Sequence, residues 1–129
     1  SLDTTREQLV MRLLAAEAKL NSSLIYNGTI GEKDWHKLLA ASQRLSVAPI
    51  FIDDTQFMPV LDMKAKARRL AADRGVGLII VDYLQLIGGS SAKESEGQEM
   101  SKISSALRSL ARELDIPVIA LFQLSRKLD

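Results

Sequence analysis

The sequence Gly77-Leu-Ile-Ile-Val-Asp82 decides the fold class of this chain. Its four central residues are apolar and mostly β-branched, and such an uninterrupted run is typical of a parallel strand covered on both faces. A second run of this kind, residues 117–122, follows a long amphipathic segment, and a third, residues 49–52, stops at Asp53. Strands that alternate with helices predict an α/β fold with a parallel sheet and right-handed crossovers.

Helices are expected between these strands, because apolar residues recur at helical spacing. Thr4 and Glu7 form a capping-box pattern before a first helix over about residues 5–20. Thr29 and Glu32 form a second such pattern before another amphipathic helix. The remaining expected helical segments are a short piece ending at 27–28, a helix over 59–75 and a long helix over 100–114.

Composition predicts one globular domain without thiol chemistry. The chain has 129 residues, of which 47% are hydrophobic and 26% charged, and this size suits a single core. No apolar run approaches the roughly 20 residues that cross a bilayer, and no signal peptide is evident, so a cytoplasmic location is expected. The absence of cysteine excludes disulfides and thiolate zinc sites. A formal charge of +1 gives no global attraction to nucleic acid, so DNA contact requires a local patch or a ring of copies.

Polar residues at the carboxyl ends of two predicted strands are the first candidates for a functional site. Asp82 and Gln123 both reach the sheet edge at which parallel α/β proteins bind ligands. A carboxylate that follows four apolar residues is costly to ionise without a partner, and a divalent cation is one such partner. A helix N-cap or a turn is the alternative role for Asp82, and the short pattern alone favours it.

A longer set of residues surrounds this strand at ordered spacing. The set comprises Ser1-Leu2-Asp3, Glu7-Gln8-Leu9, Ile52-Asp53-Asp54, Ala67-Arg68-Arg69, residues 77–87, Ile103-Ser104, Leu107, residues 110–114, residues 117–121 and Gln123-Leu124-Ser125-Arg126. In order and spacing it resembles the DnaB-type replicative DNA helicases, which belong to the RecA-like ATPase class. The resemblance implies a RecA-like parallel sheet flanked by helices, truncated so that the P-loop strand and the C-terminal strands are missing. We therefore expect residues 1–129 to form a single, partial motor domain.

The resemblance assigns roles to three residues. It makes Asp82 the Walker B aspartate, which holds the Mg²⁺ of Mg-ATP, usually through water. Gln123 matches the sensor of the γ-phosphate, with an ordinary polar residue at a strand end as the alternative. Asp3 stands where the family has the glutamate that polarises the attacking water; its side chain is one methylene shorter, and a helix cap is its alternative role. Phe122 also departs, because the family commonly has a small polar residue there.

The segment from Gly88 to Gln98 is expected to be a loop, since it has no apolar periodicity. The resemblance to the DnaB-type helicases implies that this segment is a central-channel loop that approaches single-stranded DNA. Lys93 is its only basic residue, and Glu96 and Ser105 stand where relatives often carry arginine. Residues 88–98 are therefore interpreted either as a DNA-contacting loop with a weakened contact or as a flexible linker exposed to solvent.

Three other polar residues are expected to be non-catalytic. Arg68 and Arg69 lie on the polar side of a predicted helix, where solvent or a subunit contact is their expected surrounding. His36 is the only histidine, and without a second metal ligand nearby it is expected to be structural.

The function implied by the resemblance is that of a homo-hexameric replicative helicase, which couples ATP hydrolysis to movement on single-stranded DNA and to duplex unwinding. A primase and a loader are its candidate partners. The isolated chain is expected to be inactive, because none of its seven glycines precedes a lysine as the Walker A loop requires. Residues 118–122 would then form an exposed strand edge, which predicts self-association. Another RecA-like ATPase and a catalytically dead assembly module are the alternatives.

Overall fold

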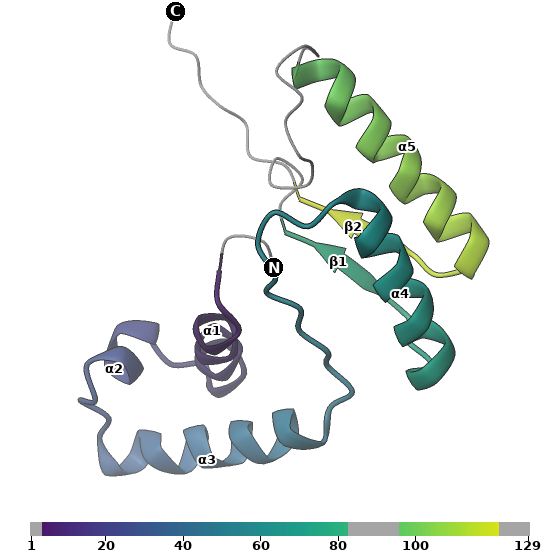
Figure 1. The fold of residues 1–129 in the computed structure, drawn as a ribbon. Helices are drawn as coiled ribbons and strands as arrows, with labels where there is room; N and C mark the ends of the chain where they lie inside the picture. The colour runs from purple at the N-terminus through teal and green to yellow at the C-terminus, as the bar shows by residue number, and fades with distance from the viewer. Residues whose placement is uncertain (1–3, 83–95, 122–129) are drawn as a thin grey trace, which may run out of the picture. The chain divides into compact units, whose positions relative to one another are not determined.

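The computed structural model describes residues 4–82 and 96–121, with the backbone alone for residues 96–99. The elements in order are α1 (Arg6–Ala18), α2 (Ser22–Tyr26), α3 (Glu32–Val47), α4 (Val60–Arg74), β1 (Ile79–Val81), α5 (Glu96–Leu114) and β2 (Val118–Ala120) (Figure 1). They group into two compact units. The helical unit is Thr4–Asp53, and the sheet unit contains the described residues from Asp54 onward.

The sheet unit is built on a pair of parallel strands. Ile79 pairs with Val118, and Val81 pairs with Ala120. The pairing extends one residue beyond each end of β2, because Ile79 N–H donates to the Pro117 carbonyl at 3.1 Å and Leu121 N–H donates to the Val81 carbonyl at 2.9 Å. A parallel pair with α5 as its connection confirms the predicted α/β fold (Figure 1).

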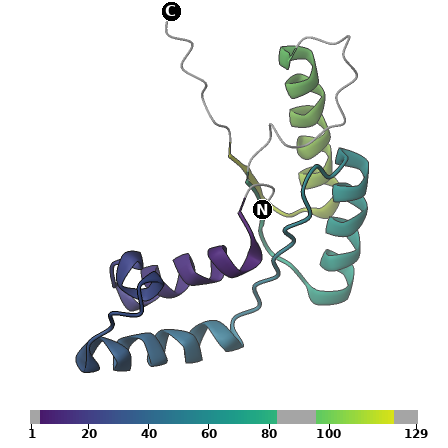
Figure 2. The ribbon, with the colours of Figure 1, turned by 60° about the vertical axis from the view of Figure 1, so that its left-hand side comes forward.

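Helices α4 and α5 cover the same face of this sheet (Figures 1 and 2). Between them and the strands lies a core whose buried members are Met58, Val81, Ile103 and Leu107. Val60, Met63, Ile79, Met100 and Val118 are partly buried against these four side chains. Burial of each large side chain contributes about 1.5–3 kcal/mol, so this core holds the strand that carries Asp82 in place.

The opposite face of the sheet is open among the described residues, which corrects the prediction of strands covered on both faces. Ile80 is 57% exposed and Ile119 is 48% exposed. The predicted strand at 49–52 is also wrong: that segment is not a strand, and Phe51 is exposed. Ile50 N–H donates to the Ala48 carbonyl at 2.8 Å, a local bond in place of a ladder. Hydrophobicity identified apolar segments here, but it could not tell which of them find a strand partner.

Both ends of α4 and the C-terminal end of α5 lie within one residue of the bounds predicted from the sequence, whereas α5 begins earlier than predicted. Pro59 is the N-cap of α4, and Gly75, in the left-handed region at φ 64°, ends it. α5 ends at Leu114, as expected, but begins at Glu96, so the last three residues of the predicted loop 88–98 are helical. Residues 88–95 lie outside the described part of the chain.

In the helical unit, α1 has the predicted kind of cap, shifted by one residue. Gln8 N–H donates to Thr5 Oγ1, and Thr5 N–H donates to Gln8 Oε1, both at 3.3 Å. The box is therefore Thr5 with Gln8 instead of Thr4 with Glu7. The second predicted box is wrong, because the N-cap of α3 is Gly31, which offers no side chain for capping. In α1 the spacing of the pattern is the predicted one, but two neighbouring threonines, Thr4 and Thr5, can take the same role.

Helices α1 and α3 pack against one another, and their fully buried side chains are small. The buried residues of these two helices are Ala15 and Ala18 on α1 and Ala41 on α3. Arg44 Nε donates to Glu17 Oε1 at 2.6 Å and links the helices at the surface. Over the part of the chain that the structure describes, no helix combines the length and the apolarity needed to cross a membrane.

Candidate functional site

Asp82 directly follows β1 and lies at its carboxyl end, as the sequence predicted. The preceding Val81 is buried at 6% exposure, while Asp82 is half-buried. The Val81 carbonyl accepts the hydrogen bond from Leu121 N–H, so the sheet remains paired up to the residue before the carboxylate. The core and the ladder together fix the backbone from which Asp82 projects.

The neighbouring strand ends at the same edge. Val81 and Ala120 are partners in the parallel register, so Asp82 and Leu121 are the first residues beyond the paired strands. Gln123 lies two residues further along the chain and, like Asp3, Lys93 and Phe122, falls outside the described residues. The shared sheet edge is thus observed, whereas the positions of these side chains remain predictions.

The donor chemistry of Asp82 fits magnesium. Within residues 4–82 and 96–121, no group of three His, Cys, Asp or Glu side chains is arranged to hold a metal ion. Mg²⁺ typically takes one or two carboxylates and completes its octahedron with water and substrate phosphates. A half-buried carboxylate at the carboxyl edge of a parallel sheet therefore suits this ion, whereas a structural zinc or calcium site would need more protein ligands.

Arg68 has a structural partner that the sequence did not reveal. Its Nε donates to Glu113 Oε1 at 2.5 Å and its Nη2 to Glu113 Oε2 at 2.8 Å, which joins α4 to α5. The Arg68 hydrogen bond, with the positive charges of Arg68 and Lys64, lowers the pKa of Glu113 below its ordinary value. Arg68 is 45% exposed, in agreement with the prediction of a solvated side chain, and the ion pair with Glu113 is an addition to that prediction. A pair separated by 45 residues has no local spacing that would signal it.

Three other positions considered in the sequence lie on helix surfaces. Arg69 is exposed on α4, and His36 is exposed on α3. Ser105, where relatives were expected to carry arginine, is exposed on α5. All three positions are therefore helical, whereas Asp82 follows a strand.

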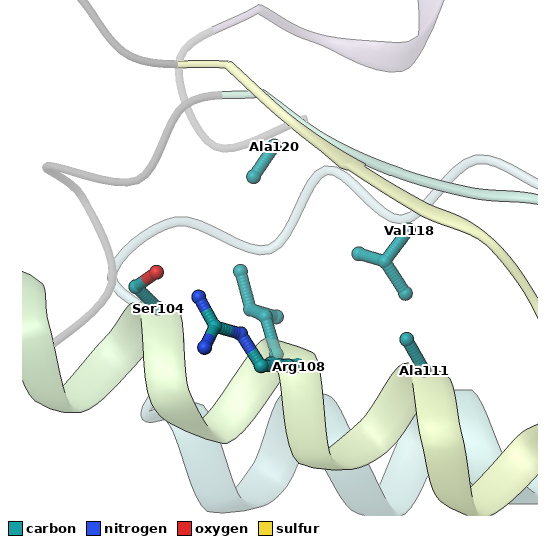
Figure 3. Close-up of a pocket in the computed structure, with 6 residues that line it drawn as sticks. Ser104, Arg108, Ala111, Val118 and Ala120 are labelled. Atoms are coloured by element: carbon teal, nitrogen blue, oxygen red, sulfur yellow. The ribbon is translucent and has the colours of Figure 1, made fainter.

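A cleft of about 300 Å³ lies between α5 and β2 and is separate from Asp82 (Figure 3). Ser104 and Arg108 of α5 point toward the strand that carries Val118 and Ala120, and Leu107 and Ala111 complete the lining. The wall is mainly apolar with one guanidinium. The sequence analysis missed Arg108, although it lies one turn beyond Ser104 and next to the core residue Leu107.

Comparison with known proteins gives a consistent result over the whole chain. The family described as DnaB-like helicase C terminal domain matches residues 1–129. The replicative DNA helicase DnaB of Geobacillus stearothermophilus is 50% identical over 130 residues, which cover 100% of this chain and 29% of that protein. The replicative DNA helicase DnaC of Bacillus subtilis (strain 168) is 50% identical over 127 residues, or 98% of this chain and 28% of the relative. The chain thus spans under a third of the length of these relatives.

Solved structures agree with the sequence relatives. A DnaB-like replicative helicase, studied for its interactions with primase, matches 98% of this chain with a TM-score of 0.85 and 32% identity, over 31% of its own chain. A separately solved ATPase domain matches with the same TM-score and identity over 46% of its chain. The predicted RecA-like fold class is confirmed by these neighbours. The chain belongs to the DnaB-like helicase C terminal domain family.

Proposed function

We propose that these residues form part of the motor of a replicative DNA helicase, in which ATP hydrolysis drives movement on single-stranded DNA and unwinding of the duplex. The observation that carries the proposal is Asp82, a half-buried carboxylate at the carboxyl end of a parallel strand, in a chain that matches the helicase family from residue 1 to residue 129. Ligands of such sheets bind at this edge.

In the proposed mechanism, Asp82 would hold the Mg²⁺ that accompanies ATP. Bound Mg²⁺ supplies charge neutralisation at the phosphoryl group. Asp3 accepts a proton from the attacking water, and the amide of Gln123 hydrogen-bonds to the γ-phosphate. Both side chains lie outside the described residues. The role of Asp3 rests on the family match, and that of Gln123 rests on the family match and on the shared edge at Asp82 and Leu121.

The partners of the whole protein are proposed on the same basis. A homo-hexamer would surround single-stranded DNA, with Lys93 as a contact to the phosphates, and a primase and a loader would act on that ring. The primase proposal is supported by the similar solved helicase that was studied with its primase.

The 129-residue polypeptide alone is proposed to be inactive. It contains no Gly-x-x-x-x-Gly-Lys-Ser/Thr sequence, so it lacks the backbone amides and the lysine with which a P-loop holds phosphates. We expect neither ATP turnover nor unwinding from this polypeptide in isolation.

A chimera tests the proposal in a complete motor. Residues 1–129 would replace the aligned 130-residue segment of the Geobacillus stearothermophilus helicase, and DNA-stimulated ATPase and unwinding would be measured. We expect activity in the chimera, and a loss of at least about 100-fold in turnover for Asp82→Asn, since removing a metal-holding charge costs several kcal/mol of transition-state stabilisation. Asp73→Asn is the matched control, because Asp73 is an exposed aspartate on α4.

Two outcomes of this experiment would count against the helicase motor. A chimera that folds and forms rings but hydrolyses no ATP, even with Asp3→Glu, would favour the catalytically dead assembly module. Equal activity of Asp82→Asn and Asp73→Asn would remove Asp82 from the site. Recovery of turnover by Asp3→Glu would instead locate the defect in the shorter general base.

A further inference from the structure

One bulky residue of the sheet unit has a backbone conformation that glycine usually takes. Phe57 has φ 51°, in the left-handed region, where an aromatic residue is strained. The other described residues with positive φ are Lys19, Gly28, Gly75 and Asp115. Each of these four lies within two residues of the end of a helix, where a left-handed residue is a common cap. Phe57 instead precedes a helix, so helix capping does not explain its conformation.

The left-handed conformation of Phe57 belongs to a tight turn. Gln56 and Phe57 are the two central residues of the turn that leads from Thr55 to Met58. Only the second of these two has positive φ, which is the pattern of a type II turn. A type II turn favours glycine or asparagine at that place, because the Cβ of other residues lies too close to the backbone. We call residues 55–58 the strained turn.

The residue after Phe57 explains why the chain turns there. Met58 is buried at 6% exposure, in the core that also contains Val81, the residue before Asp82. Pro59 follows Met58 and disfavours helical backbone at it, so Met58 enters α4 from an extended conformation. Because the backbone of Met58 is restricted in this way, Phe57 makes the reversal that brings the methionine side chain into the core.

Two hydrogen bonds hold the strained turn at its ends. Lys66 Nζ donates to Thr55 Oγ1 at 3.2 Å, which ties the start of the turn to α4. Met63 N–H donates to the Pro59 carbonyl at 3.0 Å and begins the hydrogen-bonded ladder of that helix. Strained backbone persists where the surrounding structure fixes it at several points. The buried methionine and these two bonds supply such points.

We propose that the strained turn is a conformational switch, which opens locally by withdrawing Met58 from the core while Phe57 returns to negative φ. Two opposing contributions of similar size decide between the two forms. Burial of the methionine favours the closed form, and relief of the backbone strain favours the open form. The turn therefore opens at a lower cost in free energy than the helices and strands around it.

Opening of the strained turn affects the strand that leads to Asp82. Met58 and Val81 belong to one core, so withdrawal of the methionine loosens the packing that supports the end of β1. This inference rests on backbone conformation and burial within the sheet unit, and it does not depend on the proposed helicase function.

Methionine oxidation measures the opening in the 129-residue chain. Met58 is buried, whereas Met11, Met63 and Met100 are partly exposed. Dilute hydrogen peroxide would be added to the folded chain, and the sulfoxide at each methionine would be quantified by mass spectrometry. The ratio of the oxidation rate at Met58 to that at Met63 reports the fraction of open turn, with Met63 as the internal reference.

Substitutions at position 57 separate backbone strain from loss of the aromatic ring. Phe57→Gly and Phe57→Ala both remove the ring, but only glycine takes positive φ without a steric cost. The oxidation ratio should therefore fall at least about threefold in Phe57→Gly, part of the gain being offset by the greater freedom of glycine in the open form. Phe57→Asn should fall between glycine and wild type, because asparagine tolerates left-handed backbone. Phe57→Ala should stay within about twofold of wild type.

Gly75→Ala is the matched control at the other end of α4. Gly75 has φ 64°, and a Cβ added there has no neighbouring atom within 4 Å, so the substitution adds backbone strain without a clash. It should speed amide exchange at residue 75, whose N–H donates to the Ala71 carbonyl at 3.0 Å, and leave the oxidation ratio unchanged. A ratio that rises with Gly75→Ala would show that Met58 is exposed by unfolding of the whole unit, against the proposal.

Low concentrations of urea distinguish local opening from global unfolding in the wild-type chain. Local opening exposes little surface, so the oxidation ratio should change little below the unfolding transition. A ratio that rises as steeply as the globally unfolded fraction would overturn the proposal. Equal ratios in Phe57→Gly and Phe57→Ala, or a higher ratio in the glycine variant, would also overturn it, because contacts of the ring would then hold the closed form. Circular dichroism would verify that each variant keeps its helices.

Discussion

The sheet unit and the helical unit are stabilised in different ways. The sheet unit buries large side chains from α5, β1 and the segment before α4, with Leu110 fully buried. The helical unit buries alanines where α1 meets α3, and an ion pair and a capping box support it at the surface. Volume lost from the core should therefore damage the first unit most, whereas the second should depend on local hydrogen bonds.

The largest effect is expected in the sheet unit. Leu110→Ala removes a side chain with 0% exposure from α5 and should lower the free energy of unfolding by about 2–5 kcal/mol, because a cavity replaces packed atoms. Urea denaturation followed by circular dichroism measures it. Leu61→Ala is the control, since Leu61 is 73% exposed on α4 and should change stability by less than about 0.5 kcal/mol. Equal losses in the two variants would show that Leu110 is not a core residue.

The same contrast explains which parts of the fold could be predicted from the sequence. The strand before Asp82, the parallel pairing and the helix ended by Gly75 follow from local patterns and from general rules of α/β topology. The strand at 49–52 was wrong because an apolar segment becomes a strand only if another strand is available to pair with it. The capping residues were wrong because Thr4 and Thr5 are both suitable, and only the backbone of the folded helix selects one.

The candidate site divides in a similar way. The position of Asp82 was predictable, because a residue that follows an apolar parallel strand must emerge at the carboxyl edge. The Arg68–Glu113 pair was not predictable, since it depends on how α4 and α5 lie against one another. Asp3, Lys93 and Gln123 keep the status of predictions. Their roles derive from the family. The Asp82→Asn variant of the chimera tests the role of Asp82 and does not test the roles of Lys93 and Gln123.

An intermediate effect is expected at the cap of α1 in the helical unit. Thr5→Ala removes the side chain that accepts from Gln8 N–H and should cost about 1 kcal/mol of stability. Thr29→Ala distinguishes the observed cap of α3 from the cap predicted by the sequence. Thr29 belongs to the predicted capping box, but Gly31 is the observed N-cap, so this change should lower stability by less than about 0.5 kcal/mol. Amide exchange in the first turns of α1 and α3 measures both. A larger loss at Thr29 would restore the sequence-based capping box.

The smallest effect concerns the ion pair between α4 and α5, and it should depend on pH. Arg68 and Glu113 are partly exposed, at 45% and 43% of their side chains, so solvent screens much of their attraction. Two hydrogen bonds join Arg68 to Glu113, whereas a single hydrogen bond of 2.6 Å joins Arg44 to Glu17 in the helical unit. A double-mutant cycle with Arg68→Met and Glu113→Gln should therefore give a larger coupling than a cycle on Arg44 and Glu17.

The sign of the pH dependence follows from the carboxylate. The hydrogen bond from Arg68 places the pKa of folded Glu113 below its ordinary value of 4.5, so folding favours the ionised form. The stabilisation is therefore fully present above pH 4.5 and disappears as the pH falls through the folded pKa. Arg68, whose pKa the same hydrogen bond raises, stays charged throughout this range. The coupling should decrease as the pH falls below 4.5 and should weaken in 1 M salt at pH 7. A coupling that stays constant in acid would assign the link between α4 and α5 to packing of the side-chain stems instead.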